Sequence, residues 1–364
     1  MRKEKDFEKI PCWSFFLFGV ATLALAVLIA AVISAGFADW YNRTAGAFLR
    51  TALARLTSWI PFSLAEIAVF CIPIVIVALG VYGYRRRCET WRCVFVYLGC
   101  ILSVCSILFS LFALGFGIGY QTAPLDEKMG LAPTEVTAKT LRETAEKLLG
   151  EVNALCSGIS YGEDGFSVMP YDLAGMNAAL LAAYEPVCEK YPFIQKMNSR
   201  LKPVLASRVM SYMHITGVYT YFTGEANLNV QFPDYSLCYT GAHELAHQRG
   251  IARENEANFV AFLVCSDASD VYLRYCGYLN LLEYVMNALY DVDEAAYREV
   301  MSKADERVRG EWIAYDRFFD TYRNSALSDI SGAVNDTYLK LNGNEAGTGS
   351  YGLVVELAVA YFAK

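Results

Sequence analysis

Two histidines and a glutamate form the most chemically informative motif of this 364-residue chain. Residues 243 to 247 read HELAH, so His243 and His247 are one helical turn apart and lie on the same face of a helix. Two imidazoles placed in this way can bind one zinc ion and leave a coordination position for water. Glu244 is then the candidate general base that accepts a proton from that water. The chain has 3 histidines, so the presence of two of them in this motif argues against chance.

A catalytic zinc normally has a third protein ligand, and two glutamates follow the motif. Gly250 predicts the end of the first helix and a turn, after which a second helix is expected to begin near Arg253. Glu254 is our preferred third ligand, and Glu256 is the alternative. Asn258 lies one turn after Glu254, where its amide is expected to orient a ligand histidine.

Residues 225 to 231 (EANLNVQ) alternate between apolar and polar side chains, which predicts a strand. We expect this strand to be an exposed sheet edge on which a peptide substrate adds a further strand. Glu225, Asn227 and Asn229 are the candidate substrate contacts, and Glu225 is alternatively a solvated strand end. His214 is a candidate for stabilising the oxyanion, although a lone histidine is more often a hydrogen-bonded core residue.

The elements that position these residues begin with a membrane anchor. The chain is 55% hydrophobic and its mean hydropathy is +0.27, which is too apolar for an ordinary soluble globule. Residues 13–37, 62–83 and 93–118 are nearly free of charge, and each is long enough to cross about 30 Å of hydrocarbon. We therefore predict three transmembrane helices in residues 1–118 and one further domain in residues 119–364.

Basic residues predict the orientation of these spans. They cluster before the first span and between the second and third, so both regions should face the cytoplasm. The domain after residue 118 is then extracytoplasmic, in a multi-pass protein of the cytoplasmic membrane. A cleaved signal peptide is the minor alternative, because the first apolar core is longer than about 7–15 residues. The net charge of -7 disfavours a nucleic-acid partner.

The domain after the spans is expected to be mainly helical. A helix is predicted from Pro133 to about Leu155. Helical patterns also cover residues 171–190, 200–215, 236–249, 270–290, 294–323 and 326–341, and a core helix is expected over 353–363. The fold class is therefore a mainly α membrane protein with a predominantly helical, zincin-like domain and a small β edge. The five cysteines of this domain are interpreted as small core residues, with one disulfide possible: Cys156, Cys188, Cys238, Cys265 and Cys276.

Two resemblances add to this interpretation. HELAH followed by ENEANFVA resembles the HExxH and ExEAN patterns of membrane-associated gluzincins, which implies that Glu254 is the metal ligand. The chain differs from those families in having a shorter stretch between His247 and Glu254. A second resemblance covers nearly the whole chain, through YQTAPLDEKMGL, YFTGEANLN, AHELAHQRGIARENEANF and RYCGYL. These segments resemble the bacterial domain-of-unknown-function 3810 family, which implies a membrane protein with a metallopeptidase-like site and no particular substrate.

The leading hypothesis is a membrane-anchored zinc metallopeptidase. It would be a hydrolase that cleaves a peptide or a membrane-proximal protein segment with a zinc-activated water. A cell-envelope amidase would use the same residues. A zinc-binding membrane sensor or scaffold is the alternative from a different class, and a fourth protein ligand on the metal would favour it.

Overall fold

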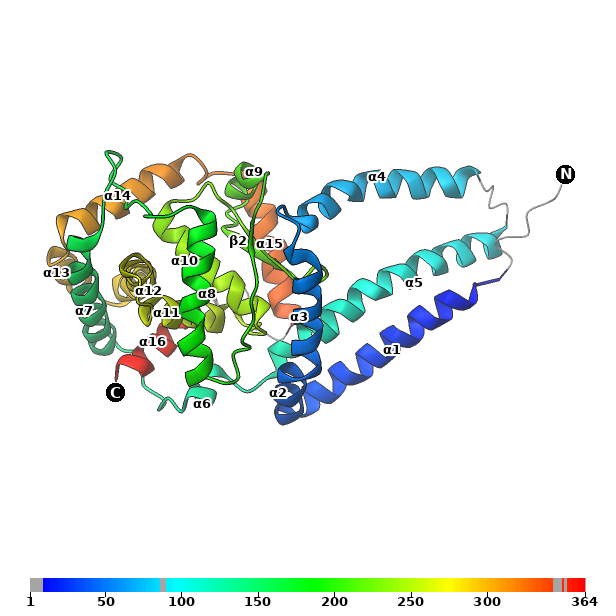
Figure 1. Cartoon of the computed structure of the whole chain (residues 1–364), viewed down its shortest axis with the longest axis horizontal. Coiled ribbons are helices and arrows are strands. Elements are labelled where there is room, and N and C mark those ends of the chain that lie inside the picture. Colours follow the sequence, from blue (N-terminus) through cyan, green and yellow to red (C-terminus); the bar gives the residue numbers. More distant parts are fainter. Residues whose placement is uncertain (1–8, 86–89, 343–348, 350–351, 364) are drawn as a thin grey trace.

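Three long apolar helices extend from one end of a helical body (Figure 1). The computed structural model describes residues 9–85, 90–342, 349 and 352–363. Helices α1 (Cys12–Ile33), α4 (Leu64–Arg85) and α5 (Trp91–Gly115) are each long and apolar enough to cross a membrane, so the three predicted helices are confirmed as candidate spans. Large apolar side chains on them are exposed, as is usual for residues that face lipid. The protein is therefore a candidate multi-pass membrane protein. Most of the basic residues used to predict orientation fall in residues 1–8 and 86–89, outside the described residues.

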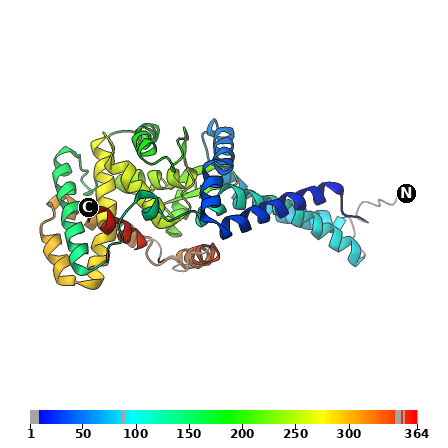
Figure 2. The same ribbon diagram turned by 90° about the horizontal axis from the view of Figure 1, so that it is seen from below.

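Helices α1 and α5 pack along each other, whereas α4 lies apart from them along most of its length (Figures 1 and 2). The contact between α1 and α5 is lined by small side chains, which allow close approach of the two backbones. Ser103 of α5 donates a hydrogen bond of 3.0 Å to Ser14 of α1, and both side chains are buried.

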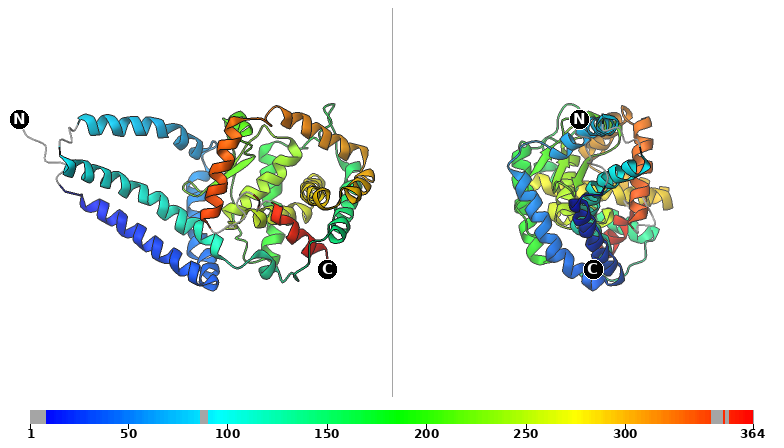
Figure 3. Two further views of the ribbon diagram at one scale, coloured as in Figure 1. Left: turned by 180° about the vertical axis from the view of Figure 1, so that it is seen from behind. Right: turned by 90° about the vertical axis from the view of Figure 1, so that its right-hand side faces the viewer.

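Two short helices follow the first span and were not predicted. They are α2 (Ala35–Arg43) and α3 (Ala45–Ser58), and both run across the direction of the spans at the border with the helical body (Figures 1 and 3). The prediction that the first span continues to residue 37 is wrong because the chain leaves the helical conformation at Ser34. The Ser34 hydroxyl accepts a hydrogen bond of 3.2 Å from the Phe37 amide and so caps α2.

A small three-stranded sheet lies between α3 and the central helices. Its strands are β1 (Leu201–Pro203), β2 (Gly217–Thr220) and β3 (Glu225–Leu228), in the order β1-β3-β2. Strand β3 pairs in parallel with β1 and antiparallel with β2. The predicted strand is thus confirmed over 225–228, but the prediction that it is an edge is wrong. The predicted helix over 200–215 is also wrong in its first part, where β1 precedes the short helix α9 (Ser207–Tyr212).

Helices make up the rest of the body, close to the predicted ranges. They are α6 (Leu125–Met129), α7 (Ala138–Leu155), α8 (Leu173–Lys190), α10 (Asp234–Gln248), α11 (Glu254–Ser266), α12 (Val271–Val292), α13 (Glu294–Ser302), α14 (Glu306–Asp320), α15 (Ala326–Leu341) and α16 (Val354–Phe362), with the 3-10 helices η1 (Gly117–Gln121) and η2 (Cys156–Gly158). The segment 294–323, predicted as one helix, is two helices. The chain breaks after Ser302, and Asp305 caps α14 by accepting a hydrogen bond of 2.9 Å from the Arg307 amide.

Helix α10 forms the centre of the body, since every side chain from Tyr235 to Gln248 is buried. Helices α8, α11 and α12 and the sheet pack around it. The five cysteines of the body are free and buried, which confirms their interpretation as core residues. A helix that is buried on all sides holds its side chains in fixed positions, and α10 carries the HELAH motif.

Candidate metal centre

A tight turn after α10 brings the three predicted metal ligands together. Gly250 has a φ of 95°, a left-handed conformation that suits glycine, and its amide donates to the His247 carbonyl at 3.0 Å. The Ile251 amide then donates to the Ala246 carbonyl at 3.2 Å, so the helix ends in a hydrogen-bonded reversal. Helix α11 begins at Glu254, whose side chain returns towards α10.

The donor atoms of this group have the spacing of a zinc site. Glu254 Oε2 lies 3.2 Å from His243 Nε2 and 3.4 Å from His247 Nε2. Ligands at about 2.0–2.1 Å from a tetrahedral zinc ion are roughly 3.3 Å apart. One donor atom from each residue lies within 4.8 Å of the other two, and each side chain is at most 12% exposed. Two imidazole nitrogens and one carboxylate oxygen therefore form a group that could hold a zinc ion.

The second nitrogen of His247 fixes the tautomer that metal binding requires. Nδ1 lies 2.7 Å from the Ile251 carbonyl oxygen, which can only accept, so Nδ1 carries the proton. The Nε2 lone pair of neutral His247 is then directed at the metal position. The Nδ1 atom of His243 is buried and has no hydrogen-bond partner within the described residues.

Charge couples Glu254 to the two histidines. Burial by itself would raise the pKa of Glu254, but the charge of His247 and hydrogen bonds from both histidines hold that pKa well below its usual range. Burial likewise lowers the pKa of His247, and the Glu254 carboxylate more than offsets this and raises it to about 9. A divalent cation would take the place of the proton on His247, because all three groups bind metal in the deprotonated form.

Glu244 is buried beside this group and faces strand β2. The Tyr219 amide of β2 donates to its carboxylate, and Oε2 is buried without a hydrogen-bond partner in the described part of the chain. Burial raises the pKa of Glu244 to about 7, although the two neighbouring histidines act to lower it. A carboxylate with a pKa near neutrality is suited to accept and then return a proton.

Strand β2 approaches Glu244 so closely that only glycine fits at one position. A Cβ atom on Gly217 would lie 2.6 Å from Glu244 Oε1 and 2.8 Å from Thr240 Cγ2. Strand β2 is one of the two edge strands of the sheet, and it is the one whose backbone contacts the candidate base.

The other predicted ligands and supporting residues have different partners. Glu256 accepts a hydrogen bond of 2.7 Å from Arg253 and one of 3.0 Å from the Leu125 amide, so its carboxylate holds the start of α6. Asn258 lies beside the Tyr284 hydroxyl, and neither histidine is hydrogen-bonded to its side chain among the described residues. His214 hydrogen-bonds through Nε2 to the Tyr322 carbonyl at 2.8 Å and packs on Phe319.

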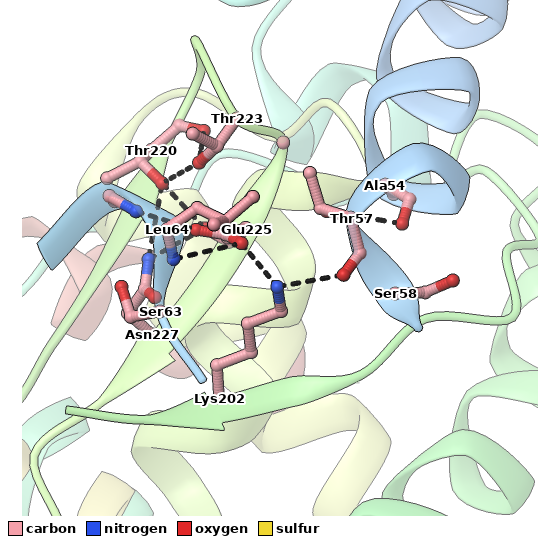
Figure 4. A network of polar contacts seen from close by, with 12 residues as sticks. Ala54, Thr57, Ser58, Ser63, Leu64, Lys202, Thr220, Thr223, Glu225 and Asn227 are labelled. Atoms are coloured by element: carbon pink, nitrogen blue, oxygen red, sulfur yellow. Dashed lines mark hydrogen bonds and ion pairs between the residues drawn. The ribbon is translucent and has the colours of Figure 1, made fainter. Parts of the chain in front are cut away.

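Glu225, predicted as a substrate contact, is buried in a network that joins β1 and β3 to α3 and to the start of α4 (Figure 4). Its carboxylate pairs with Lys202, and it accepts hydrogen bonds from the amides of Leu64, at 3.3 Å, and Ala65, at 3.0 Å, at the start of α4. Lys202 also donates to the Thr57 carbonyl at the end of α3, at 2.9 Å. Glu225 therefore caps the N-terminus of α4, which is a candidate membrane span.

Asn227 and Asn229 are also engaged within the fold. The Asn227 amide donates to the Val218 carbonyl at 3.2 Å. The Asn229 amide donates to the Ser211 hydroxyl at 3.0 Å and to the Ile215 carbonyl at 2.9 Å. These side chains bind the segments next to β3, and the prediction that they line an exposed edge is wrong for the same reason as for Glu225.

Comparison with protein families matches residues 41–359 to "Protein of unknown function (DUF3810)". The match runs from α2 to α16 and includes the three candidate ligands. The chain belongs to the DUF3810 family. Comparisons with curated proteins and with solved structures each found no match. The family resemblance seen in the sequence is thus confirmed, and the DUF3810 description assigns no activity.

In this DUF3810 protein, two neighbours of the metal group come from the segments next to the candidate spans. The ring of Phe116, which follows α5 directly, packs edge-on against His247 at a centroid distance of 5.6 Å. Asn42 of α2 donates to the Gly250 carbonyl at 2.9 Å, in the turn that places Glu254. Neither residue could be predicted from the sequence, because each contact joins segments more than a hundred positions apart.

Arg50 of α3 completes this junction. It is buried, and it donates to the Asn42 carbonyl at 2.7 Å and to the Gly115 carbonyl at 3.2 Å. Burial lowers its pKa to about 10. The metal group is therefore built against the ends of the candidate spans and not at the far end of the body.

Proposed function

We propose that this DUF3810 protein is a membrane-anchored zinc-dependent metallopeptidase. The observation that carries the proposal is the convergence of His243, His247 and Glu254 at zinc-like spacing beside the buried carboxylate of Glu244. The group found among the described residues has three members. Three protein ligands leave a coordination position open, as in catalytic zinc sites, whereas structural sites use four. This favours a hydrolase over a sensor or scaffold.

The residues of the chain divide the chemistry between them. A zinc ion held by the three ligands would polarise a carbonyl and lower the pKa of water. Glu244 accepts one proton from the attacking water as its oxygen bonds to the peptide carbonyl carbon. The C–N bond then breaks, and Glu244 returns the proton to the leaving amine. Strand β2, as the edge beside Glu244, supplies backbone groups along which an extended peptide can align.

The proposed substrate is a peptide or a membrane-proximal protein segment outside the cytoplasm. The basic residues around the first two spans support this orientation in the cytoplasmic membrane. Phe116 against His247 places the metal group close to the end of α5, which supports a substrate that is near the bilayer.

The test compares zinc content and peptide cleavage for detergent-purified wild type, Glu244→Gln and His243→Ala. Wild type is expected to hold about one zinc per chain and to cleave members of an unbiased peptide library. Glu244→Gln should keep the zinc and lose about 10²–10⁴-fold in kcat, because only proton transfer is removed. His243→Ala should lose both. His214→Ala is the matched control, since it removes the histidine outside the motif, and it should retain zinc.

Each other outcome has a distinct meaning. Wild type without zinc at near-stoichiometric supply contradicts the metal assignment. Zinc bound with no cleavage of peptides or membrane-protein segments would favour the sensor or scaffold. Cleavage confined to cell-envelope peptides carrying non-protein amide bonds would identify an amidase with the same catalytic residues.

A further inference from the structure

Helix α15 exposes a stripe of large apolar side chains. Leu327, Ile330, Val334 and Leu341 are 46%, 63%, 65% and 82% exposed. Their spacing of three, four and seven residues places them on one face of the helix. Asp329 lies about 100–160° around the helix from these residues, on its polar side, where it is exposed. The helix is thus amphipathic, and its apolar face is not covered by the part of the helical body that the structure describes.

The apolar stripe faces the side of the molecule from which the spans emerge. Tyr338 lies on the same helical face as the stripe, and its ring contacts Phe112 of α5 at a centroid distance of 6.0 Å. Phe112 is three residues before the end of that span at Gly115. Helix α15 runs across the direction of the spans at the border of the helical body (Figures 1 and 3).

Two other segments at this border also expose large apolar side chains. On α3 these are Phe48 and Leu56, followed by Trp59 just before the start of α4. After β1, Leu205 is exposed, and its amide donates to Glu66 in the first turn of α4 at 3.0 Å. Exposed apolar residues therefore surround the ends of the spans on three separate segments, and each of them is tied to a span by a contact or by the chain.

We propose that the apolar face of α15 rests in the lipid leaflet nearer the helical body, in the plane of the bilayer. The position of the stripe beside the end of α5, together with the exposed apolar residues that α3 and the segment after β1 carry at the same border, favours lipid over a protein partner. Amphipathic helices of this kind insert their apolar face about 5–10 Å into the boundary between headgroups and acyl chains. This inference does not depend on the proposed peptidase activity, but it adds that the metal group is held close to the lipid surface.

The experiment places a tryptophan on each face of α15 in the full-length protein. Ile330→Trp adds one on the apolar stripe, and Asp329→Trp is the matched control on the polar side of the same helix. Both are reconstituted in phosphatidylcholine nanodiscs with either ordinary or brominated acyl chains, since bromine quenches tryptophan on contact. The chain has 5 native tryptophans, so the reported signal is the variant spectrum minus that of wild type.

For Ile330→Trp, brominated lipid is expected to reduce the added fluorescence about twofold or more, because the side chain lies at acyl-chain depth. Asp329→Trp should be quenched little by lipid and strongly by aqueous acrylamide. Equal lipid quenching at both positions, or strong acrylamide quenching at position 330, would overturn the proposal. So would protection at position 330 that appears only with two copies per nanodisc, which would identify a second chain as the partner.

Discussion

The buried pair of Lys202 and Glu225 allows a quantitative test of how α3 and α4 are held against the sheet. Both side chains are at most 1% exposed, and the carboxylate has two further donors, the amides at the start of α4. Lys202→Met keeps the volume of the side chain and removes its charge. The remaining buried carboxylate is then without a counter-charge, which typically costs about 3–5 kcal/mol.

This loss of stability is measurable by thermal unfolding in detergent, followed by intrinsic fluorescence. A cost of 1 kcal/mol lowers Tm by about 2–4 °C for a domain of 150–250 residues, so Lys202→Met should lower Tm by roughly 6–20 °C. Lys202→Met combined with Glu225→Gln should recover at least half of this, because the amide oxygen is neutral and still accepts from the α4 amides.

The matched control for the pair is Lys303→Met. Lys303 pairs with Glu146 at 2.9 Å, but its side chain is 50% exposed. Surface pairs contribute about 0–1 kcal/mol, so this variant should change Tm by no more than a few degrees. If Lys202→Met has no larger effect than Lys303→Met, or if the double variant is less stable than Lys202→Met alone, the view that charge burial dominates is refuted.

Three further predictions concern glycines and a buried acid. Gly217→Ala should retain zinc and lose at least tenfold in kcat, because the new Cβ displaces the Glu244 carboxylate; unchanged turnover with bound zinc would contradict this. Gly224→Ala should lower Tm, because φ there is 69° and the Cβ would lie 2.9 Å from the backbone of α3, whereas Gly332→Ala, with open space around it, should leave Tm unchanged or slightly raised. Burial raises the pKa of Glu283 to about 7, so its stabilising contribution is greatest below its usual pKa of 4.5 and is lost as pH rises through 7. Glu283→Gln should therefore reduce the fall in Tm between pH 5 and 8, and an unchanged or steeper fall measured by the same melts would be evidence against this.

The sequence was most informative where function depends on local spacing. His243 and His247 lie on one helix, so their separation alone predicts their convergence. Gly250 predicted the turn, and Glu254 rather than Glu256 meets the histidines because α11 begins at Glu254. The spans were predictable because hydropathy is a property of contiguous segments.

The sequence was least informative where function depends on contacts between distant segments. Strand β2 has four residues and no alternating pattern, so the edge beside Glu244 was not predicted. Alternation in residues 225–231 predicted a strand. Alternation alone cannot show whether that strand pairs with a neighbour on each side or lies at an edge of the sheet. The burial of Glu225 depends on Lys202 and on amides about 160 positions earlier, which local pattern cannot reveal.

The cap on α4 constrains the order in which the protein is made. The Leu64 and Ala65 amides emerge from the ribosome 161 and 160 residues before the carboxylate that binds them. Asn42 likewise precedes by 208 positions the Gly250 carbonyl to which its side-chain amide donates. During synthesis the start of α4 therefore remains without its cap until β3 has been made and the sheet has folded. The cap on α4 and the contacts around the metal group therefore form only late, after β3 and α10 have been made. A chain truncated before β3 should keep an uncapped α4, and the cell should recognise it as an unassembled membrane protein.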